Sequence, residues 1–420
     1  MQRLVIEGEK RLVGELEVHG AKNSALPLLA ACVLSRGESC LHNCPKLSDV
    51  YAACRILSCL GCKCERNGDT VTVNTDGLTH FDVPDELMRE MRSSIVFLGA
   101  ILGRVGKCRL SFPGGCELGP RPIDMHISAL RQMGAEIKEE HGTLECDVGH
   151  GLKGAKIVLS FPSVGATENI ILAAAAAKGT TVIHNAAREP EISDLARFLN
   201  KCGAKISGFG EDTVTIVGVD KLHGCEYEVM PDRIVAATYL SAAASTGGEL
   251  TLLNTRVEDI ETVLPVFEQM GCILYTYDDR LYINARRGLK AVKTIRTMPF
   301  PGFPTDAQAV VMAALTKARG TSVMIENIFS NRFRHVDELV RMGADIKTEG
   351  KVAIIDGVKR LSGACVRAGD LRGGAALVVA GLGAEGITEV SDIKYIDRGY
   401  EAIEQAFSSV GGMIKRVQEQ

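Results

Sequence analysis

The hydrophobic and polar residues of this chain switch between two periods, and the switch recurs six times. A segment with the apolar spacing of a helix ends in a short motif, roughly Leu-x-x-Met-Gly-Ala-x-Ile, and a segment with strand-like alternation follows it. Glycine accepts the left-handed conformation that commonly ends a helix, so each motif predicts a helix, a cap and a strand. The copies are about seventy residues apart, which indicates one multiplied module. The capping residues are Gly61, Gly134, Gly203, Gly271, Gly343 and Gly411.

Each repeat also contains a second helical segment, which is rich in alanine and apolar on nearly every side. Such a helix is expected to be buried, here inside a shell of strands. A short strand, a loop and the amphipathic helix follow it, and two or three strands come after the glycine. The buried helices are expected to begin near residues 22, 92, 163, 232, 305 and 372.

The two ends of the chain complement each other. The sixth copy stops before its strands are complete, whereas residues 1–21 supply strand patterns with no preceding helix. We therefore expect the N-terminal strands to complete the sixth module. Three modules would form a domain of residues 22–229, and three would form a domain of residues 230–420 plus 1–21. Ligand sites favour positions between domains, so the active site is expected there.

The composition excludes several classes of protein. The 420 residues are 46% hydrophobic, enough for large cores, and the net charge of −4 disfavours binding to nucleic acid or membrane surfaces through bulk electrostatics. No signal peptide is apparent, and the apolar runs are shorter than the ~18–20 residues of a membrane helix. Fourteen cysteines without a leader sequence fit a reducing compartment, so a cytoplasmic location is expected.

The tight cysteine group Cys59, Cys62 and Cys64 could be a metal site or part of a core. Other repeats carry alanine at the position of Cys62 and isoleucine at the position of Cys64. Cysteine often behaves as a small buried hydrophobe, and the spacing at a helix end does not suit a four-ligand site. The sequence therefore favours packing, and no metal or other cofactor is predicted.

Basic residues recur where the buried helices are expected to begin. A cation is unfavourable at a helix N-terminus, whereas phosphates and carboxylates are favourable there. These side chains either pair with nearby carboxylates, remain solvated, or bind an anionic ligand, and their recurrence favours the ligand. The cations are Lys22, Arg92, Arg233 and Arg372.

The loop of residues 113–124 is the clearest departure from the repeat. It is rich in glycine and proline, and the other modules have no equivalent of its Cys116. Nearby arginines are expected to lower the pKa of this thiol, which could then act as a nucleophile or a proton donor. The alternative is an incidental loop cysteine. A phosphate loop is disfavoured because its lysine is missing.

Two further basic sites open the last amphipathic helices, and one acid stands at a buried helix. Arg332 and Arg398 offer the bidentate geometry that suits carboxylates and phosphates. Asp306 follows Pro304 and Thr305 at the start of a buried helix. It could be a simple N-cap, or its carboxylate could face a ligand.

Seven segments resemble one known family: KNSALPLLAA, MRSSI, PGGCELGPRPIDMHI, PSVGATENI, PGFPTDAQA, SNRFRHVDEL and YIDRGYE. They are similar to the UDP-N-acetylglucosamine enolpyruvyl transferases (1-carboxyvinyltransferases), over essentially the full length. The resemblance implies an α/β fold, a two-domain inside-out α/β barrel of six modules. It also implies transfer of the enolpyruvyl group of phosphoenolpyruvate to the 3-hydroxyl of UDP-N-acetylglucosamine. Phosphate would leave after addition and elimination through a tetrahedral ketal, in the first committed step of peptidoglycan synthesis.

The resemblance also assigns roles to residues of this sequence. It implies Cys116 as the acid and the target of the inhibitor fosfomycin, Asp306 as the base, and Asn23 as a contact of the sugar. The phosphoenolpyruvate cations would be Lys22, Arg121 and Arg398, with Arg92, Arg332 and Arg372 nearby. The nucleotide pocket would comprise Arg121, Pro122, Ile123, Asp124, Met125, Ser163, Val164, Gly165, Thr305, Asp306 and Ile328.

The sequence departs from the family at three places, and rival functions remain. Phe161 stands where many relatives have a basic residue, Gly373-Gly374 replaces a larger first residue, and Pro120 stiffens the cysteine loop. The rivals are the related 5-enolpyruvylshikimate-3-phosphate synthase, a non-catalytic binding paralogue and a DNA clamp. The cysteine loop and RPIDM argue against the first, and the apolar helices and negative charge argue against the last.

Overall fold

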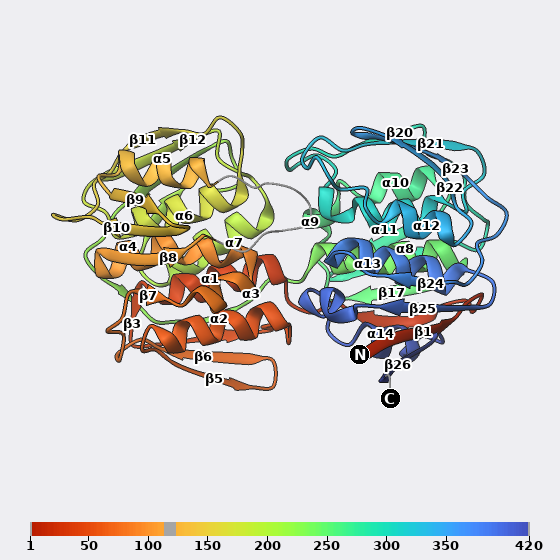
Figure 1. Ribbon diagram of the computed structural model, residues 1–420, viewed down its shortest axis with the longest axis horizontal. Coiled ribbons are helices and arrows are strands. Elements are labelled where there is room, and N and C mark those ends of the chain that lie inside the picture. The colour runs from red at the N-terminus through yellow and green to blue at the C-terminus, as the bar shows by residue number, and fades with distance from the viewer. Residues whose placement is uncertain (1, 113–122, 419–420) are drawn as a thin grey trace. The chain divides into compact units, whose positions relative to one another are not determined.

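The chain divides into two compact units, each described here by itself. The structure is a computed structural model, and it describes residues 2–112 and 123–418. One unit, called the N-unit, comprises the described residues between Gly20 and Met230. The other, called the C-unit, comprises residues 2–19 and 231–418. Each unit contains three copies of one α/β module (Figure 1).

The third module shows the shared plan without interruption. Strand β11 (Lys156–Val158) leads into the buried helix α6 (Val164–Ala175), and β12 (Thr180–His184) returns parallel to β11. Helix α7 (Pro190–Lys201) then covers the sheet, and the hairpin of β13 (Lys205–Ser207) and β14 (Thr213–Val217) completes it. The sheet order is β11-β12-β14-β13, so the first pair is parallel and the remaining pairs are antiparallel.

The other two N-unit modules follow the same order. The first has β3 (Ser35–Arg36), which pairs with β15 (Leu222–His223), and α1 (Lys22–Cys32), β4 (Glu38–His42), α2 (Ser48–Cys59), β5 (Lys63–Asn67), β6 (Thr70–Asn74) and β16 (Glu226–Glu228). The second has β7 (Asp82–Val83), α3 (Asp85–Glu90), the 3₁₀ turn η1 (Arg92–Val96), α4 (Phe97–Val105), β8 (Lys107–Ser111), α5 (Asp124–Gln132), β9 (Glu136–Glu140) and β10 (Thr143–Asp147).

The C-unit repeats the plan three more times. The fourth module has β2 (Val13–Glu17), α8 (Arg233–Thr246), β17 (Glu249–Leu253), α9 (Val257–Ile260), α10 (Leu264–Gln269), β18 (Ile273–Tyr277) and β19 (Arg280–Asn284). The fifth has β20 (Thr294–Arg296), α11 (Thr305–Leu315), β21 (Thr321–Ile325), α12 (Val336–Arg341), β22 (Asp345–Glu349) and β23 (Val352–Asp356). The sixth has β24 (Cys365–Arg367), α13 (Leu371–Gly383), β25 (Ile387–Ser391), η2 (Ile393–Arg398), α14 (Ile403–Ser409), β26 (Met413–Gln418) and β1 (Gln2–Glu7).

The N-terminal strands do not both complete the sixth module, which corrects the expectation from the sequence. Strand β1 does so, because it lies between β25 and β26 and pairs with both. Strand β2 instead pairs in parallel with β17 and supplies the first strand of the fourth module. Similarly, β16 supplies the first strand of the first module through its pairing with β4. Strands β2 and β16 each precede a point where the chain passes from one unit to the other, and each pairs with a module other than the one it follows in sequence.

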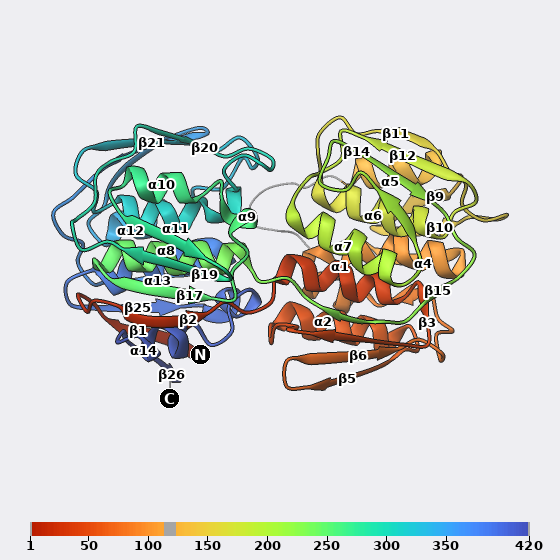
Figure 2. The same ribbon diagram turned by 180° about the vertical axis from the view of Figure 1, so that it is seen from behind.

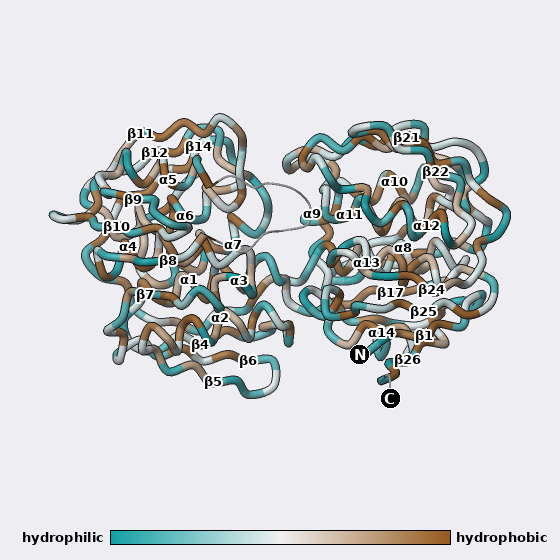
Figure 3. The backbone as a smooth tube through the Cα atoms, in the orientation of Figure 1, coloured by the Kyte–Doolittle hydropathy of each residue, from teal (hydrophilic) through white to brown (hydrophobic). Residues whose placement is uncertain are grey.

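Each unit has its own hydrophobic core, built on the alanine-rich helices. Helix α8 buries every residue from Ile234 to Ser245, and it packs against α11 and α13 in the C-unit. In the N-unit, α4 packs against α6 and α1 packs against α7. Here the sheet of β5 and β6 and the sheet of β11 and β12 lie on opposite sides of α1 and α6 (Figure 2). Hydrophilic residues are frequent in the loops around these helices (Figure 3).

The six repeat glycines are confirmed as left-handed caps. Their φ angles lie between +91° and +100°, a range that side chains with a Cβ rarely adopt. The Ala-rich segments are confirmed as buried helices, although the one expected near residue 92 opens with the 3₁₀ turn η1. Among the helices of the described residues, none is both long and apolar enough to cross a bilayer.

Candidate active site

Asp306 lies in the first turn of α11 and is held by two arginines. Its Oδ1 accepts a hydrogen bond from Arg332 Nη2 at 2.9 Å, and its Oδ2 accepts one from Arg372 Nη2 at 3.1 Å. Both arginine side chains are 3% exposed, whereas the Asp306 side chain is 28% exposed. The helix is capped by Pro304 without a side-chain hydrogen bond, so Asp306 is not an N-cap. Its carboxylate is held by the two arginines and remains partly exposed.

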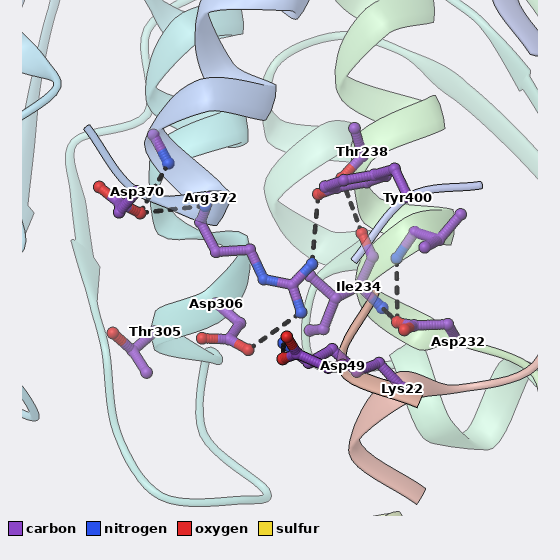
Figure 4. A network of polar contacts seen from close by, with 12 residues as sticks. Lys22, Asp49, Asp232, Ile234, Thr238, Thr305, Asp306, Asp370, Arg372 and Tyr400 are labelled. Carbon is purple, nitrogen blue, oxygen red and sulfur yellow. Dashed lines mark hydrogen bonds and ion pairs between the residues drawn. The ribbon is translucent and has the colours of Figure 1, made fainter. Parts of the chain in front are cut away.

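Arg372 lies in a group of hydrogen-bonded side chains that come from all three modules of the C-unit (Figure 4). Its Nη1 donates to the Tyr400 hydroxyl at 3.3 Å, and that hydroxyl lies 2.8 Å from Thr238 Oγ1 on α8. Asp370 caps α13 by accepting from the backbone N–H groups of Arg372 and Gly373, both at 3.0 Å. Burial has the largest single effect and disfavours the guanidinium charge, but Asp306, Tyr400 and Asp232 together outweigh it and raise the pKa of Arg372.

A buried glutamate joins α11 to the loop that follows β21. Glu326 Oε2 accepts a hydrogen bond from Thr305 Oγ1 at 3.0 Å, while Oε1 accepts from the backbone N–H groups of Ile328 and Phe329. Arg332 Nη2 also donates to the carbonyl oxygen of Thr305 at 3.1 Å. The predicted residues Thr305, Ile328 and Arg332 are therefore parts of one hydrogen-bonded group beside Asp306.

In the N-unit, the basic residue at the start of α1 has an acidic partner. Lys22 Nζ lies 2.6 Å from Asp49 Oδ2, and the two side chains are 9% and 3% exposed. Asp49 belongs to the first turn of α2, where the helix dipole favours an acid. Asn23 is the second residue of α1 and is half-buried. The Lys22 charge is thus paired with a buried carboxylate.

The predicted nucleotide segment packs against the start of α6. Ile123, Asp124 and Met125 lie at the beginning of α5, and the Met125 sulfur accepts a hydrogen bond from Ser160 Oγ at 3.6 Å. The next residue, His126, is buried with Nδ1 2.7 Å from Asn169 Nδ2, and burial lowers its pKa to about 4.

The N-terminus of α6 is capped by a serine side chain and lies close to α5. Ser163 is the N-cap, and its Oγ accepts a hydrogen bond from the backbone N–H of Ala166 at 3.3 Å. Val164 and Gly165 are the first two residues of the helix. A Cβ on Gly165 would lie 3.2 Å from the His126 ring, so a glycine suits this contact between α5 and α6. The two segments expected to bind the nucleotide therefore touch each other within the N-unit.

Arg398 is the last residue of η2 and is half-buried. Its neighbour Asp397 accepts a bidentate pair of hydrogen bonds from Arg416 at 2.7 and 3.0 Å. Hydrogen bonds to Asp397 and Glu404 outweigh the effect of burial and raise the pKa of Arg416. Arg416 is therefore paired with Asp397, which lies next to the predicted substrate cation Arg398.

One departure from the family pattern, the pair Gly373-Gly374, has a local structural reason. A Cβ on Gly373 would lie 2.8 Å from Asp370 Oδ2 and 2.9 Å from the Cβ of His335. A Cβ on Gly374 would lie 2.8 Å from a side-chain carbon of Ile396. Both glycines therefore permit close packing at the start of α13. Phe161 is 40% exposed, and nothing in the structure explains why it replaces a basic residue.

Some predicted residues cannot be placed. Cys116, Arg121, Pro122 and the departure at Pro120 lie outside the described residues, and Arg92 is placed only as the first residue of η1. A cavity of about 540 Å³ in the N-unit borders β7 and β8, with Cys59, His80 and Arg109 among its lining residues. None of the predicted site residues that the structure describes lines this cavity.

Comparisons with known proteins decide the family. A family model described as EPSP synthase (3-phosphoshikimate 1-carboxyvinyltransferase) matches residues 6–407. UDP-N-acetylglucosamine 1-carboxyvinyltransferase 2 of Caldanaerobacter subterraneus subsp. tengcongensis is 52% identical over 417 residues, which cover 99% of this chain and 100% of the relative. The chain belongs to the EPSP synthase family.

A further relative agrees in sequence, and two solved structures agree in fold. UDP-N-acetylglucosamine 1-carboxyvinyltransferase of Nitratidesulfovibrio vulgaris is 48% identical over 421 residues and covers both chains fully. The enolpyruvyl transferase NikO of Streptomyces tendae has a TM-score of 0.89 at 22% identity, over 100% of this chain and 99% of the other. EPSP synthase of Acinetobacter baumannii has a TM-score of 0.75, with both chains fully covered. The predicted two-domain α/β fold of six modules is confirmed.

In this EPSP synthase family member, sequence reasoning missed the residues that hold the site residues in place. Asp49 stands in the first turn of an amphipathic helix, where an acid is common for helical reasons alone. Tyr400 is two residues after Arg398, inside a segment quoted for its resemblance, yet its contact with Arg372 joins distant parts of the sequence. Glu326 carries no sequence signal because its partners are two backbone N–H groups and a threonine.

Proposed function

We propose that the protein transfers the enolpyruvyl group of phosphoenolpyruvate to the 3-hydroxyl of UDP-N-acetylglucosamine with release of phosphate. The full-length identity to proteins named UDP-N-acetylglucosamine 1-carboxyvinyltransferase carries this proposal. The reaction is the first committed step of peptidoglycan synthesis and so serves cell-wall growth, cell shape and division. The free thiols of all the described cysteines support a reducing cytoplasmic location.

In this proposal, cations bind the phosphate and carboxylate groups of phosphoenolpyruvate. Arg332 and Arg372, which hold the Asp306 carboxylate, are buried guanidiniums of the kind that binds carboxylate and phosphate groups. Lys22, Arg121 and Arg398 would contact phosphoenolpyruvate directly, with Arg92, Arg332 and Arg372 nearby. Asn23 would hold the sugar and the tetrahedral intermediate.

Asp306 would act as the base and Cys116 as the acid of the addition step. The sugar hydroxyl attacks C2 of phosphoenolpyruvate while Asp306 accepts the hydroxyl proton and Cys116 delivers a proton to the methylene carbon. Loss of a proton and of phosphate from the ketal then restores the double bond. Hydrogen bonds from Arg332 and Arg372 hold the Asp306 carboxylate in position for this role. Positioned acids and bases contribute on the order of 10²–10⁴ in rate.

The nucleotide would bind along α5 and α6 of the N-unit. Arg121, Pro122, Ile123, Asp124 and Met125 would contact the nucleoside. The N-terminus of α6, with Ser163, Val164 and Gly165, would receive the diphosphate because its backbone N–H groups and helix dipole favour anions. From the C-unit, Thr305, Asp306 and Ile328 would act on the same substrate.

Dependence on the acceptor tests the reaction. Phosphate release from phosphoenolpyruvate should require UDP-N-acetylglucosamine, and shikimate 3-phosphate should not replace it. Dependence on shikimate 3-phosphate would instead support a 5-enolpyruvylshikimate-3-phosphate synthase. Tight binding of UDP-N-acetylglucosamine without any phosphate release would support a non-catalytic paralogue.

The role of Cys116 has a matched control in a second thiol. Cys116→Ala should abolish or severely lower turnover and should prevent alkylation by the epoxide fosfomycin, measured by mass spectrometry of the intact protein. Cys365 is an exposed free thiol of the C-unit, so Cys365→Ser should leave turnover and alkylation unchanged. Full activity of Cys116→Ala would refute its assignment as the acid.

A further inference from the structure

A cluster of metal-binding side chains lies on the outer face of the first N-unit sheet, apart from the residues assigned to the transfer reaction. One ligand atom each from Cys40, His42 and Glu226 lies within 4.8 Å of the others. Cys40 and His42 are two residues apart on β4, so they share one face of the strand. Glu226 is on β16, directly opposite Cys40 in the parallel pairing. The exchange of β16 into this sheet therefore assembles the cluster.

We propose that Cys40, His42 and Glu226 bind a zinc ion. Thiolate, imidazole and carboxylate are the three protein ligands of zinc, whereas calcium and magnesium prefer oxygen alone. Zinc bond lengths of about 2.0–2.3 Å in a tetrahedron require ligand atoms about 3.3–3.8 Å apart. The ligand atoms lie within 4.8 Å of one another, so side-chain rotation would bring them to these distances, and water would occupy the fourth position.

The imidazole of His42 is oriented for this role by a relay of hydrogen bonds. Thr70 Oγ1 donates to Asp69 Oδ1 at 3.4 Å and lies 3.1 Å from His42 Nδ1. A hydroxyl that donates to the aspartate accepts from Nδ1–H, which leaves the lone pair of Nε2 for a metal. Partners of this kind fix the tautomer and direction of a ligating histidine.

Two other modules of the same chain each contain part of the cluster. In the third module, Thr213 Oγ1 donates to Asp212 at 3.0 Å and lies 3.4 Å from His184 Nδ1, which repeats the relay. There, however, Val182 takes the place of Cys40 and Lys156 takes the place of Glu226.

The sixth module contains the complementary part. Cys365 on β24 lies opposite Glu389 on β25, with the thiol 3.9 Å from the carboxylate, but Ser391 takes the place of the histidine. The relay and the Cys–Glu pair thus occur separately elsewhere, and only the first module combines them among the described residues. These modules provide internal controls.

The metal would join two strands that are distant in sequence. Strand β16 is short and is the last element before the chain leaves the N-unit at Met230. A bond from Glu226 through zinc to β4 would restrain this strand, and because the site is assembled only in the folded chain, zinc binding would stabilise the fold. Glu38 on β4 and Glu228 on β16 share the exposed side of this region, and their charges favour a cation.

Cobalt(II) titration of the purified full-length protein, kept reduced by a phosphine, tests the site. Cobalt replaces zinc in tetrahedral sites and gives a thiolate-to-cobalt charge-transfer band in the near ultraviolet. We expect one equivalent to produce the band and zinc to abolish it. The band should disappear in Cys40→Ser and persist in Cys365→Ser and His184→Gln. Thr70→Val should weaken cobalt affinity about 10–100-fold by releasing the histidine.

A second measurement separates metal binding at this site from binding by other thiols. Zinc should slow amide hydrogen exchange in β16 and β4 of the unaltered protein but not of Cys40→Ser, whereas exchange in the third module should not change. Absence of the band, its persistence in Cys40→Ser, or its equal loss in Cys365→Ser would overturn the proposal. Enzymatic turnover of Cys40→Ser should be unchanged, so this test is independent of the proposed reaction.

Discussion

The two units place charge differently at the starts of their buried helices. In the C-unit, one carboxylate, Asp306, meets two guanidiniums and is 28% exposed. In the N-unit, one lysine meets one aspartate, and both are at least nine-tenths buried. The first arrangement brings two buried guanidiniums to one partly exposed carboxylate, whereas the second joins one buried lysine to one buried aspartate. The difference indicates that the Asp306 group is built for chemistry on an anion and that the lysine pair also supports the fold.

The largest expected effect comes from removing the charge of Asp306. Asp306→Asn keeps the size of the side chain and should lower turnover by about 10²–10⁴ because an amide accepts no proton. Binding of UDP-N-acetylglucosamine, measured by calorimetry, should persist. Asp370→Asn is the matched control, since asparagine caps a helix as well as aspartate does. Loss of nucleotide binding in a folded Asp306→Asn protein would indicate a substrate-holding role instead.

Breaking the Lys22–Asp49 ion pair should mainly affect stability. Asp49→Asn leaves the Lys22 charge buried beside a neutral amide, which costs about 3–5 kcal/mol when one partner of a buried pair is removed. Hydrogen exchange should show weakened protection of α1 and α2. Asp85→Asn, which removes an exposed partner of Arg89, should leave protection unchanged. Equal protection in both variants would show that Lys22 does not depend on Asp49.

Acid should destabilise the N-unit through His126. Burial lowers the pKa of this histidine from 6.5 to about 4, so the folded state keeps it neutral while the unfolded state takes up a proton. Stability is therefore fully present above pH 6.5 and falls by about 3 kcal/mol as the pH drops toward 4. Urea denaturation across this range should show the slope, and His126→Gln should reduce it. His150→Gln, at an exposed turn, should not.

The repeat was predictable from the sequence because its signals are local. A glycine after an amphipathic run requires only its own backbone angle, and all six glycines have it. The predicted position of β2 was wrong because strand pairing depends on partners far along the chain, and β2 pairs with β17 of the fourth module. In the candidate site, the cations could be predicted from their unfavourable helix positions. Their partners Asp49 and Tyr400 could not, since distant packing brings them there.

The smallest effect tests how closely the start of α13 is packed around Arg372. In Gly373→Ala, the new Cβ would meet Asp370 Oδ2 at 2.8 Å and the His335 Cβ at 2.9 Å, distances at which one neighbour must move. Overpacking of this kind typically costs about 1–3 kcal/mol. Because Asp370 caps the helix and Arg372 follows the cap, the shift should also disturb the arginine and raise the KM for phosphoenolpyruvate.

Gly369→Ala is the control for this crowding, since a Cβ there meets nothing within 4 Å. It should leave both the thermal midpoint and KM unchanged. A lower midpoint with an unchanged KM in Gly373→Ala would mean that Arg372 keeps its place independently of the cap. Its contacts with Asp306 and Tyr400 would then suffice to hold it.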